Sequence, residues 1–423
     1  MIQVAIDFDA GKIWFGSGGT YFESGNPSTG ANAAMTFTGG AELLTPVVRT
    51  MASTFNFNFG QRAFSYTVPT GYKTLESRNL PLTTPSIVRP QKHFETILYT
   101  GQNTSSLYNV TGLEFAPDLV WAKTRNDTVG HVIIDTVRGN DKQIQADVSD
   151  AEVTRGTPSY RFLKDGFAVS TGGNMNNPAN YAAWSWKGGG AAVSNTDGSI
   201  TSSVSANQEA GFSICSWTIN TSGVYTIGHG LGKAPDWIMM KNRDTTNNWD
   251  CYHSYIGNTK RFKLNSRDAG EDYTEPWNDT TPTSSVFTST GSWLGGNGNK
   301  IIAYCWTSIP GYSKMGGYTG NGSSDGPYIH LGFRPAWLLI KADLSESWYL
   351  YDNKRNVSNV VDNEFRVDHE YVAGTFTTAD FLSNGFKILA TDSAANGSGS
   401  SYFYIAFAEQ PGTTPFDTFP NAR

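Results

Sequence analysis

The chain has 423 residues, of which 16% are charged and 13% aromatic, with 45 glycines and a formal net charge of −6. At roughly 100–200 residues per domain, this length predicts three or four domains. Nucleic acids bind to clustered cations, and the lack of any run of Lys or Arg excludes a nucleic-acid partner. No apolar stretch reaches about 18 residues, so no helix is expected to insert into a membrane.

The composition predicts an all-β protein. Glycines, aromatic residues and many Ser, Thr and Asn suit short strands joined by tight turns, and helical periodicity is nearly absent. The start MIQVAIDFD has neither a basic segment nor a long apolar core, so it is not expected to be a secretory signal. Cys215, Cys251 and Cys305 are too few for a disulfide framework, which predicts reduced, buried thiols in a chain that folds in a reducing cytosol.

The first 90 residues differ in pattern from the rest of the chain. A hairpin is predicted over residues 2–15, with Val4, Ile6 and Phe8 on one face and a turn over residues 9–12. The alternation of apolar and polar residues indicates that one face of the hairpin is buried in a core.

Most of residues 2–75 resembles the second half of a SPRY domain. The segments DFDAGKIWF at 7–15, LTPVV at 44–48 and FNFNFGQRAF at 55–64 are similar to its D-x-D-x-G-x-I-W-F, F-P-A-V and V-x-x-N-F-G-Q-R-P-F motifs. The resemblance implies a partial β-sandwich over residues 1–90 that lacks the strands of the first half. Half a sandwich leaves open edges, so another polypeptide or a neighbouring copy of this chain is expected to cover it.

One motif occurs three times later in the chain, as GLEFAPDLVWAK at 112–123, GLGKAPDWIMMK at 230–241 and LGFRPAWLLIK at 331–341. Three occurrences indicate duplication. Proline precedes lysine by six positions in every copy: Pro117 and Lys123, Pro235 and Lys241, Pro335 and Lys341.

The motif reads as a buried strand that begins after a proline. Proline suits this place because it lacks the N–H that a central ladder needs. The apolar run lacks clean alternation, so both faces of the strand are expected to be covered, with Trp121, Trp237 and Trp337 in the core. The lysine is expected to mark the exit of the strand to solvent; a repeated cationic ligand site is the alternative.

The spacing between successive prolines is 118 and then 100 residues, so each copy is a domain large enough for its own core rather than a solenoid repeat. The predicted organisation is several tandem antiparallel β-sandwich domains, lectin-like or SPRY-like, that follow one another as beads. Their extents are 94–190 for repeat 1, 191–207 for a Gly/Ser/Thr linker, 208–310 for repeat 2, 316–411 for repeat 3 and 412–423 for a tail.

The repeats resemble a tandem domain of unknown function in virion and tail-fibre proteins of tailed bacteriophages. Its signature is similar to G-L-G-F-x-P-D-L-V-W-I-K-x-R followed by H-x-x-x-D-x-V-R-G, which residues 112–125 and 131–139 match closely. Residues 230–243 keep the first part only, and the third copy is the most diverged.

This resemblance implies a bacteriophage virion structural protein, in first place a tail fibre that acts in host-surface recognition and adsorption. It further implies a homotrimer that assembles in the host cytoplasm, joins other virion proteins through residues 1–90, and binds a polysaccharide or protein receptor on the host cell. A head fibre or tail-assembly protein without receptor contact is one alternative. A polysaccharide depolymerase tailspike is the other.

No residue pattern points to catalysis, a metal or a cofactor. Paired carboxylates that could cleave a glycan occur only in turns or polar loops and are interpreted as structural or solvated: Asp7 with Asp9, Glu271 with Asp272, and Asp147 and Asp150 with Glu152. The six histidines have no metal-ligand spacing. The chain is therefore not expected to be an enzyme.

Two tryptophans in polar loops are the candidate receptor or glycan contacts, because an exposed aromatic ring stacks well on a sugar. They are Trp277 in EPWN and Trp293 in GSWLGG. Packing within the protein is the favoured interpretation for Trp277, whereas both interpretations stay open for Trp293.

Overall fold

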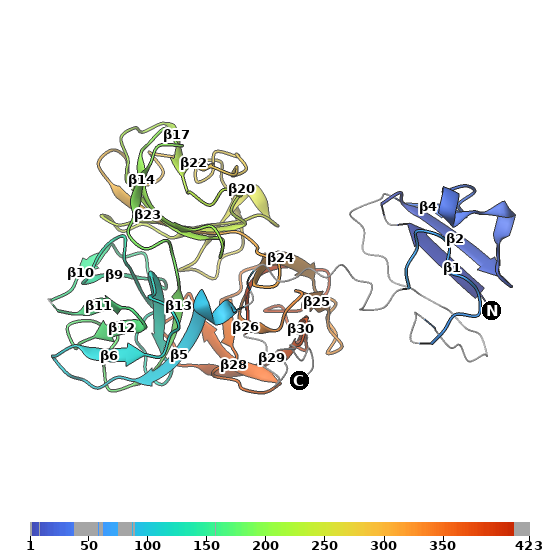
Figure 1. The fold of residues 1–423 in the computed structure, drawn as a ribbon. Helices are drawn as coiled ribbons and strands as arrows, with labels where there is room; N and C mark the ends of the chain where they lie inside the picture. The colour runs from blue at the N-terminus through green and yellow to red at the C-terminus, as the bar shows by residue number, and fades with distance from the viewer. Residues whose placement is uncertain are drawn as a thin grey trace. The chain divides into compact units, whose positions relative to one another are not determined.

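The computed structural model describes residues 2–7, 9–37, 58, 62–74, 87, 89–156 and 158–409. The chain divides into two compact units, Met1–Thr84 and Pro85–Arg423 (Figure 1). Every strand ladder among the described residues is antiparallel, and regular helix is limited to 3-10 turns such as η1 (Phe22–Ser24), η2 (Pro27–Thr29) and η4 (Pro90–Lys92). The predicted all-β, sandwich-like class is confirmed.

The first unit contains the predicted hairpin. It consists of β1 (Ile2–Asp7) and β2 (Lys12–Ser17), with β3 (Thr20–Tyr21) and β4 (Met35–Thr36) both paired to β2. Ile6 lies opposite Ile13 in this ladder, and the Asp7 carboxylate accepts a hydrogen bond from Ala10 N in the turn. The predicted turn is therefore confirmed.

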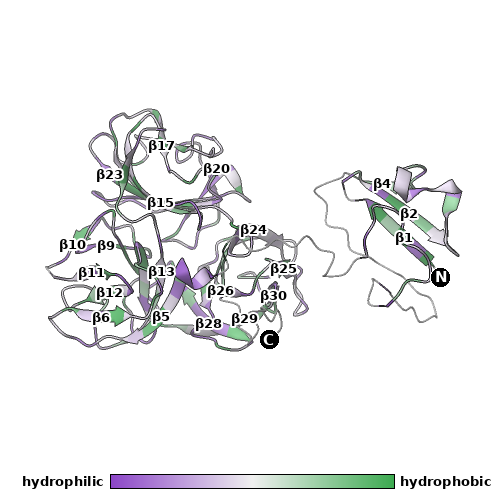
Figure 2. Cartoon of the chain, in the orientation of Figure 1, coloured by the Kyte–Doolittle hydropathy of each residue, from purple (hydrophilic) through white to green (hydrophobic). Residues whose placement is uncertain are grey.

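The buried face of this hairpin is the one opposite to that predicted. Trp14 is 1% exposed, donates from Nε1 to the carbonyl of Ala31 and packs edge-on against Tyr72. On the other face, Ile2 and Val4 are 64% and 51% exposed. Figure 2 shows the mixture of apolar and polar residues along β1 and β2. Residues 22–32 supply the cover for Trp14, a role that the strand pattern alone did not show. Phe8, residues 44–48 and most of residues 55–64 lie outside the described residues, as does the predicted tail.

Repeat 1 has a six-stranded sheet in the order β10-β9-β8-β7-β13-β5 and a three-stranded sheet in the order β11-β12-β6. Its strands are β5 (Phe94–Thr100), β6 (Tyr108–Thr111), β7 (Leu119–Thr124), β8 (Val132–Asp135), β9 (Lys142–Gln145), β10 (Val153–Thr154), β11 (Tyr160–Leu163), β12 (Gly166–Val169) and β13 (Asn180–Trp186).

Repeat 2 has an eight-stranded sheet in the order β14-β15-β16-β23-β18-β19-β20-β21 and a two-stranded sheet, β17-β22. Its strands are β14 (Val193–Asn195), β15 (Ser202–Asn207), β16 (Phe212–Thr218), β17 (Val224–Gly228), β18 (Trp237–Asn242), β19 (Asp250–His253), β20 (Gly257–Lys263), β21 (Glu271–Asp272), β22 (Val286–Thr290) and β23 (Lys300–Trp306).

Repeat 3 joins all its strands in one path, β24-β31-β26-β27-β28-β29-β30-β25. Its strands are β24 (Ser313–Thr319), β25 (Tyr328–His330), β26 (Pro335–Ala342), β27 (Trp348–Asp352), β28 (Val361–Arg366), β29 (Gly374–Leu382), β30 (Gly385–Ile388) and β31 (Ser401–Ala408).

The three motif prolines occupy equivalent positions, as the duplication predicts. Pro117 and Pro235 stand two residues before β7 and β18, and Pro335 opens β26. Each of these strands lies between the closing strand of its repeat (β13, β23 or β31) and the strand that follows it in sequence.

Residues 191–207 form structure instead of an extended linker. Their strands β14 and β15 make a hairpin that pairs with β16 and lengthens the sheet of repeat 2. Val204 faces the interior of this repeat, and the Ser and Thr residues fit the pleated surface. The many Gly and Ser residues predicted a linker, since they are also typical of flexible segments, and they outweighed the β-propensity of the Val and Thr residues.

The repeats are not separate beads. Each repeat has a private core, which in repeats 1 and 2 lies between the large and the small sheet. A fourth core joins all three repeats on the other face of the motif strands β7, β18 and β26. Every residue of β7 and β18 is buried, which confirms that both faces of the motif strand are covered. The second face is covered by the neighbouring repeats, seen as three lobes around a common centre in Figure 1.

The shared core is built from aromatic side chains. Trp186 of repeat 1 lies 6.0 Å from Trp306 of repeat 2 and 5.8 Å from Trp337 of repeat 3, measured between ring centroids. Edge-to-face pairs at such distances stabilise a core beyond the area they bury. Trp121, Trp237 and Trp337 are all fully buried here, as predicted.

Candidate functional site

The lysine of the repeated motif is buried where its repeat adjoins another: Lys241 adjoins repeat 1, Lys341 adjoins repeat 2, and Lys123 adjoins repeat 3. Lys123, Lys241 and Lys341 are at most 1% exposed, so the predicted exit of the strand to solvent is wrong. Lys241 Nζ donates to the carbonyls of Asn242 (2.8 Å) and, in repeat 1, Ser149 (3.2 Å). Backbone acceptors likewise surround the other two ammonium groups. These lysines hold loops together and are not accessible as a cationic ligand site.

Burial lowers the pKa of each of these lysines from 10.5 to about 8. The free energy of unfolding is therefore expected to increase between about pH 8 and 10, because the unfolded chain retains protons that the folded chain has released. The gain should be about 2 kcal/mol per lysine. Above about pH 10 the buried tyrosines oppose it, since burial raises their pKa, as for Tyr99.

Urea titrations across this pH range check the prediction. Lys241→Met should reduce the gain, whereas the exposed Lys233→Met should leave it unchanged. A free energy of unfolding that falls steadily from pH 8 to 10 would contradict it.

A cyclic set of hydrogen bonds closes the three repeats into a ring. His131, Trp249 and Trp348 occupy equivalent places seven or eight residues after the motif lysine. Each lies within hydrogen-bond distance of a carbonyl at the end of a strand in the preceding repeat: Arg366 (3.2 Å), Gln145 (2.9 Å) and Lys263 (2.9 Å), respectively. Repeat 1 thus contacts repeat 3. Head-to-tail interfaces of one kind therefore join all three repeats into a closed ring.

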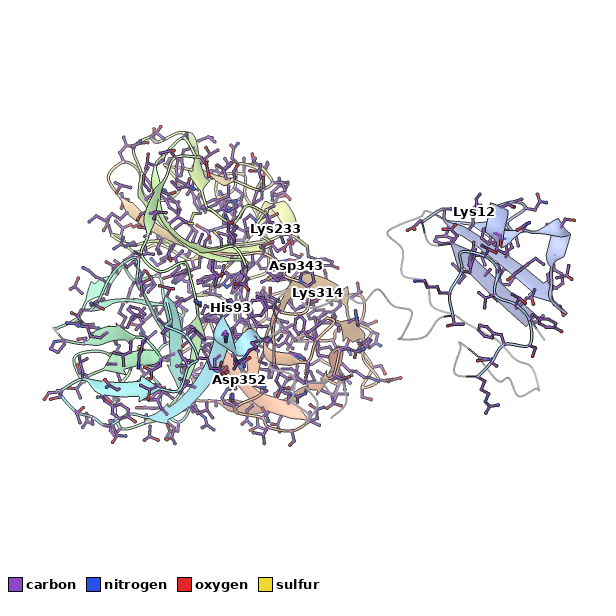
Figure 3. The ribbon with its side chains drawn as sticks, viewed as in Figure 1. Lys12, His93, Lys233, Lys314, Asp343 and Asp352 are labelled. Atoms are coloured by element: carbon purple, nitrogen blue, oxygen red, sulfur yellow. The ribbon has the colours of Figure 1, made fainter. Side chains whose placement is uncertain are left out.

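A second cyclic contact runs in the opposite direction. Asp135, His253 and Asp352 are equivalent, and each contacts the closing strand of the next repeat: Tyr304 hydroxyl (2.7 Å), Tyr404 carbonyl (3.1 Å) and Trp184 Nε1 (3.1 Å), respectively. Asp343 and Asp352 lie where lobes adjoin in Figure 3. Burial lowers the pKa of His253 to about 4, so its ring is neutral at pH 7.

Asp135 also pairs with the Arg138 guanidinium, and Asp352 pairs in the same way with Arg355. Both arginines donate to a strand carbonyl of their own repeat, Ile133 or Leu350. The Asp-x-x-Arg element therefore recurs in repeats 1 and 3 as a buried brace, not as a catalytic pair.

Tyr304→Phe is expected to reduce the free energy of unfolding by about 2 kcal/mol, because the buried Asp135 carboxylate loses a hydrogen bond from another repeat. Tyr312→Phe is the matched control: the Tyr312 hydroxyl is buried without a hydrogen-bond partner among the described residues, so its removal should cost nothing. Denaturant midpoints measure both. Equal losses in the two variants would contradict the role of Asp135.

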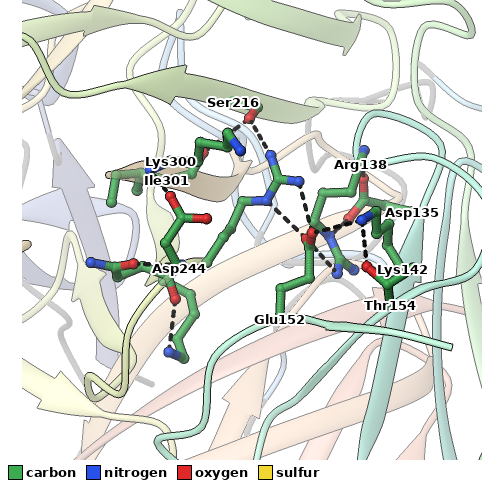
Figure 4. A network of polar contacts seen from close by, with 12 residues as sticks. Asp135, Arg138, Lys142, Glu152, Thr154, Ser216, Asp244, Lys300 and Ile301 are labelled. Atoms are coloured by element: carbon green, nitrogen blue, oxygen red, sulfur yellow. Dashed lines mark hydrogen bonds and ion pairs between the residues drawn. The ribbon is translucent and has the colours of Figure 1, made fainter. Parts of the chain in front are cut away.

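Glu152 joins repeats 1 and 2 through a charged network (Figure 4). Its carboxylate accepts two hydrogen bonds from the Arg243 guanidinium, at 2.8 and 3.0 Å, and one from Arg138 at 3.5 Å. Lys142 lies 3.8 Å away. Glu152 thus balances cations from both repeats, in agreement with its interpretation as structural.

The two candidate tryptophans have different surroundings. Trp277 is 1% exposed, packs against Tyr252 in the private core of repeat 2, and cannot stack on a ligand in this conformation. Trp293 is half-buried and lies 5.3 Å from Tyr273, which is 43% exposed. Only Trp293 therefore remains a candidate contact, now with a neighbour that the sequence did not single out.

Charged side chains fix the Trp293 ring. Its Nε1 donates to the buried Asp250 carboxylate at 2.9 Å, and the Arg261 guanidinium lies 4.4 Å from its ring centre and 5.1 Å from that of Tyr273. Arg261 also donates to Asp250 and pairs with Glu271, both at 2.7 Å. These contacts hold two adjoining aromatic rings in place without help from a ligand.

The acids at this site are engaged in ion pairs. Burial raises the pKa of Asp250, and Arg261 opposes that shift. Glu271 also binds Lys263 at 2.7 Å. No group of three or more His, Cys, Asp or Glu side chains that could hold a metal ion occurs among the described residues. The geometry fits an aromatic surface for binding, with its charges used for positioning.

All three cysteines are free and buried, as predicted. In the part of the chain that the structure describes, no helix has the length and apolar character needed to span a bilayer.

The chain belongs to the DUF7483 family, a domain of unknown function, which its sequence matches over residues 89–411. The match covers the three repeats together, in agreement with their single shared core. Neither a curated protein nor a solved structure shows significant similarity to the chain.

Proposed function

We propose that this protein is a bacteriophage virion structural protein, a tail fibre that binds the host-cell surface. The resemblance of residues 94–411 to virion repeats motivates the proposal. The observation that carries the binding role is the fixed pair Trp293 and Tyr273, an aromatic surface on a rigid β-scaffold. Such surfaces stack on sugar rings or anchor protein interfaces.

The proposed anchor is the first unit. In its described part, Ile2 and Val4 present an apolar strand face, and Met1–Thr84 form a compact unit of their own. A virion protein that covers this face would join the fibre to the particle and leave the ring free to contact the host. We further propose that the fibre is a homotrimer, to be checked by mass measurement of the full chain in solution.

Adsorption of the purified full chain to cells that the phage infects tests the binding role. Saturable binding without shortening of isolated host polysaccharide is the expected result. Trp293→Ala should weaken binding, while Tyr371→Ala, an exposed tyrosine in repeat 3, should not. Shortened polysaccharide chains would establish the depolymerase instead, and absence of binding would favour a purely structural component.

Deletion of residues 1–84 is expected to leave a soluble, folded ring that no longer enters virions, because residues 85–423 form a unit by themselves. Complementation of phage that lack the full-length gene, followed by detection of the protein in purified particles, measures incorporation. Normal incorporation of the shortened chain would contradict the proposed anchor.

A further inference from the structure

The hairpin β14–β15 breaks the threefold equivalence of the repeats. In repeats 1 and 3 the strands equivalent to β16, which are β5 and β24, end their sheets. In repeat 2 the hairpin continues the sheet beyond β16. The described contacts that close the ring occur in all three repeats, two of which lack a hairpin, so ring closure does not explain it.

The hairpin, β16 and the start of β23 border a groove of about 550 Å³. Its lining is rich in Ser and Thr hydroxyls and includes one side-chain amide, two cations and the apolar Ile200 and Trp217; no carboxylate lines it among the described residues. The polar side chains that the argument uses are Ser194, Ser203, Thr218, Asn220, Arg243 and Lys300.

Most of these polar groups are available to a ligand. Ser203, Thr218 and Lys300 are exposed, and their side chains make no hydrogen bond to another described residue. Thr218 and Lys300 lie opposite each other in the ladder between β16 and β23. Hydroxyls that both donate and accept thus stand beside a free ammonium group.

The other cation is a fixed part of the groove wall. Arg243 donates to Glu152 through two nitrogens and to Ser216 Oγ at 3.2 Å through the third, so Glu152 offsets its charge. Among the described residues, Lys300 Nζ makes no ion pair, and the nearby Asp244 carboxylate accepts its hydrogen bond from the backbone N–H of Lys300 at 2.7 Å. A rigid wall, free hydroxyls and one free cation match a polyhydroxylated ligand that carries an anionic group.

We propose that this groove binds an acidic saccharide, with the carboxylate of a uronic acid at Lys300 and sugar hydroxyls at Ser203, Thr218 and Asn220. The inference names a ligand class for the proposed host recognition and rests on that proposal only for the source of the saccharide. It places the contact on the hairpin side of repeat 2, which requires neither Trp293 nor Tyr273.

Titration calorimetry of the full chain with alginate and oligogalacturonate fragments tests the proposal, with dextran fragments and inorganic phosphate as comparison ligands. The uronates should bind, and dextran and phosphate should not. Lys300→Gln should weaken uronate binding about tenfold, the effect of losing one charge-assisted hydrogen bond. Lys233→Gln removes an exposed lysine elsewhere in repeat 2 and should leave binding unchanged.

Thr218→Trp provides a second variant that alters no charge. It fills the groove from an exposed strand position, so it should abolish uronate binding while the thermal midpoint of unfolding stays the same. Failure of the wild-type chain to bind uronates would overturn the proposal. Uronate binding by Lys300→Gln and Thr218→Trp that is as tight as that of the wild-type chain would also overturn it. Phosphate binding as strong as uronate binding would reduce the groove to a simple anion site and also overturn it.

Cell adsorption separates this inference from the proposed function. Uronate binding without adsorption to host cells would leave the groove assignment standing and remove the fibre role. Absence of uronate binding by the wild-type chain, together with adsorption that is the same in the wild-type chain and in Thr218→Trp, would remove the groove assignment and leave the fibre role.

Discussion

Residues 85–423 are expected to fold alone and to unfold in one cooperative transition, whereas a single excised repeat is expected not to fold. The difference arises from the shared core, which takes one face of the large sheet of every repeat. In an isolated repeat 2 with its hairpin (residues 191–310), Phe212, Trp237 and Trp306 would lose their cover. At about 25 cal/mol per Å² of apolar surface, exposing several large aromatics removes more stability than a domain of this size has in reserve.

Calorimetry of fragments measures this effect. For residues 85–423, the calorimetric and van't Hoff enthalpies should agree, which is the mark of a single transition. Fragment 191–310, which keeps the hairpin β14–β15, should show no transition, or should associate through its exposed face. A pair of repeats, residues 85–310, is the control for chain length and should also fail, because the third side of the core stays open. Three separate transitions in the intact unit would restore the arrangement of independent beads.

The sequence correctly predicted that the motif strands are buried on both faces, but it did not predict that neighbouring repeats cover one of those faces. The unbroken apolar run after Pro117 showed that both faces of its strand are covered, and the structure buries every residue of β7. Periodicity reports that a face is dry, but it does not tell what covers it. The missed signal was the amount of apolar surface in one repeat. The three-stranded sheet of repeat 1 can cover only one face of its large sheet. The closing strand β13 is nevertheless apolar on both faces, as Trp184 and Ala183 show, so a second partner was needed.

The motif lysines show a second limit. A lysine at the end of an apolar run normally reaches solvent with its ammonium group. Here the acceptors for Lys241 include a carbonyl of another repeat, Ser149, which no local pattern could locate. By contrast, the Asp-x-x-Arg element in repeats 1 and 3 was readable in the sequence, and its recurrence could have indicated a buried brace.

The candidate site was predictable only in part. A single aromatic in a polar loop drew attention to both Trp277 and Trp293, but the loop pattern is the same whether the ring points inward or outward. Arg261 from strand β20 and Tyr273 from the segment after β21 complete the surface at Trp293. Their approach depends on the fold of the whole repeat. The groove in repeat 2 was not predictable for a related reason: the Gly- and Ser-rich composition of residues 191–207 predicts a linker, whereas they form the hairpin that borders the groove.

Trp186→Ala is expected to reduce the free energy of unfolding of residues 85–423 by about 3–5 kcal/mol, the usual cost of removing a large aromatic from a core. Trp186 is 1% exposed, and its ring lies near side chains of all three repeats, including Phe94 at 4.9 Å and Phe407 at 5.6 Å. The loss should therefore destabilise the ring as a whole. Tyr371→Ala removes a 55% exposed aromatic from repeat 3 and should change stability by only about 0.5 kcal/mol.

Trp186→Phe refines this test. The indole nitrogen of Trp186 is buried without a hydrogen-bond partner among the described residues, so the stabilising part of the side chain is its ring area. Phenylalanine keeps most of that area and removes the unpaired donor, so its cost should be well below that of alanine. Urea midpoints give the free energies, and amide hydrogen exchange gives their distribution. Protection in β7, β18 and β26 should fall together in Trp186→Ala, because one central side chain supports all three. Loss of protection confined to repeat 1 would show that the three large sheets do not stabilise one another through the shared core.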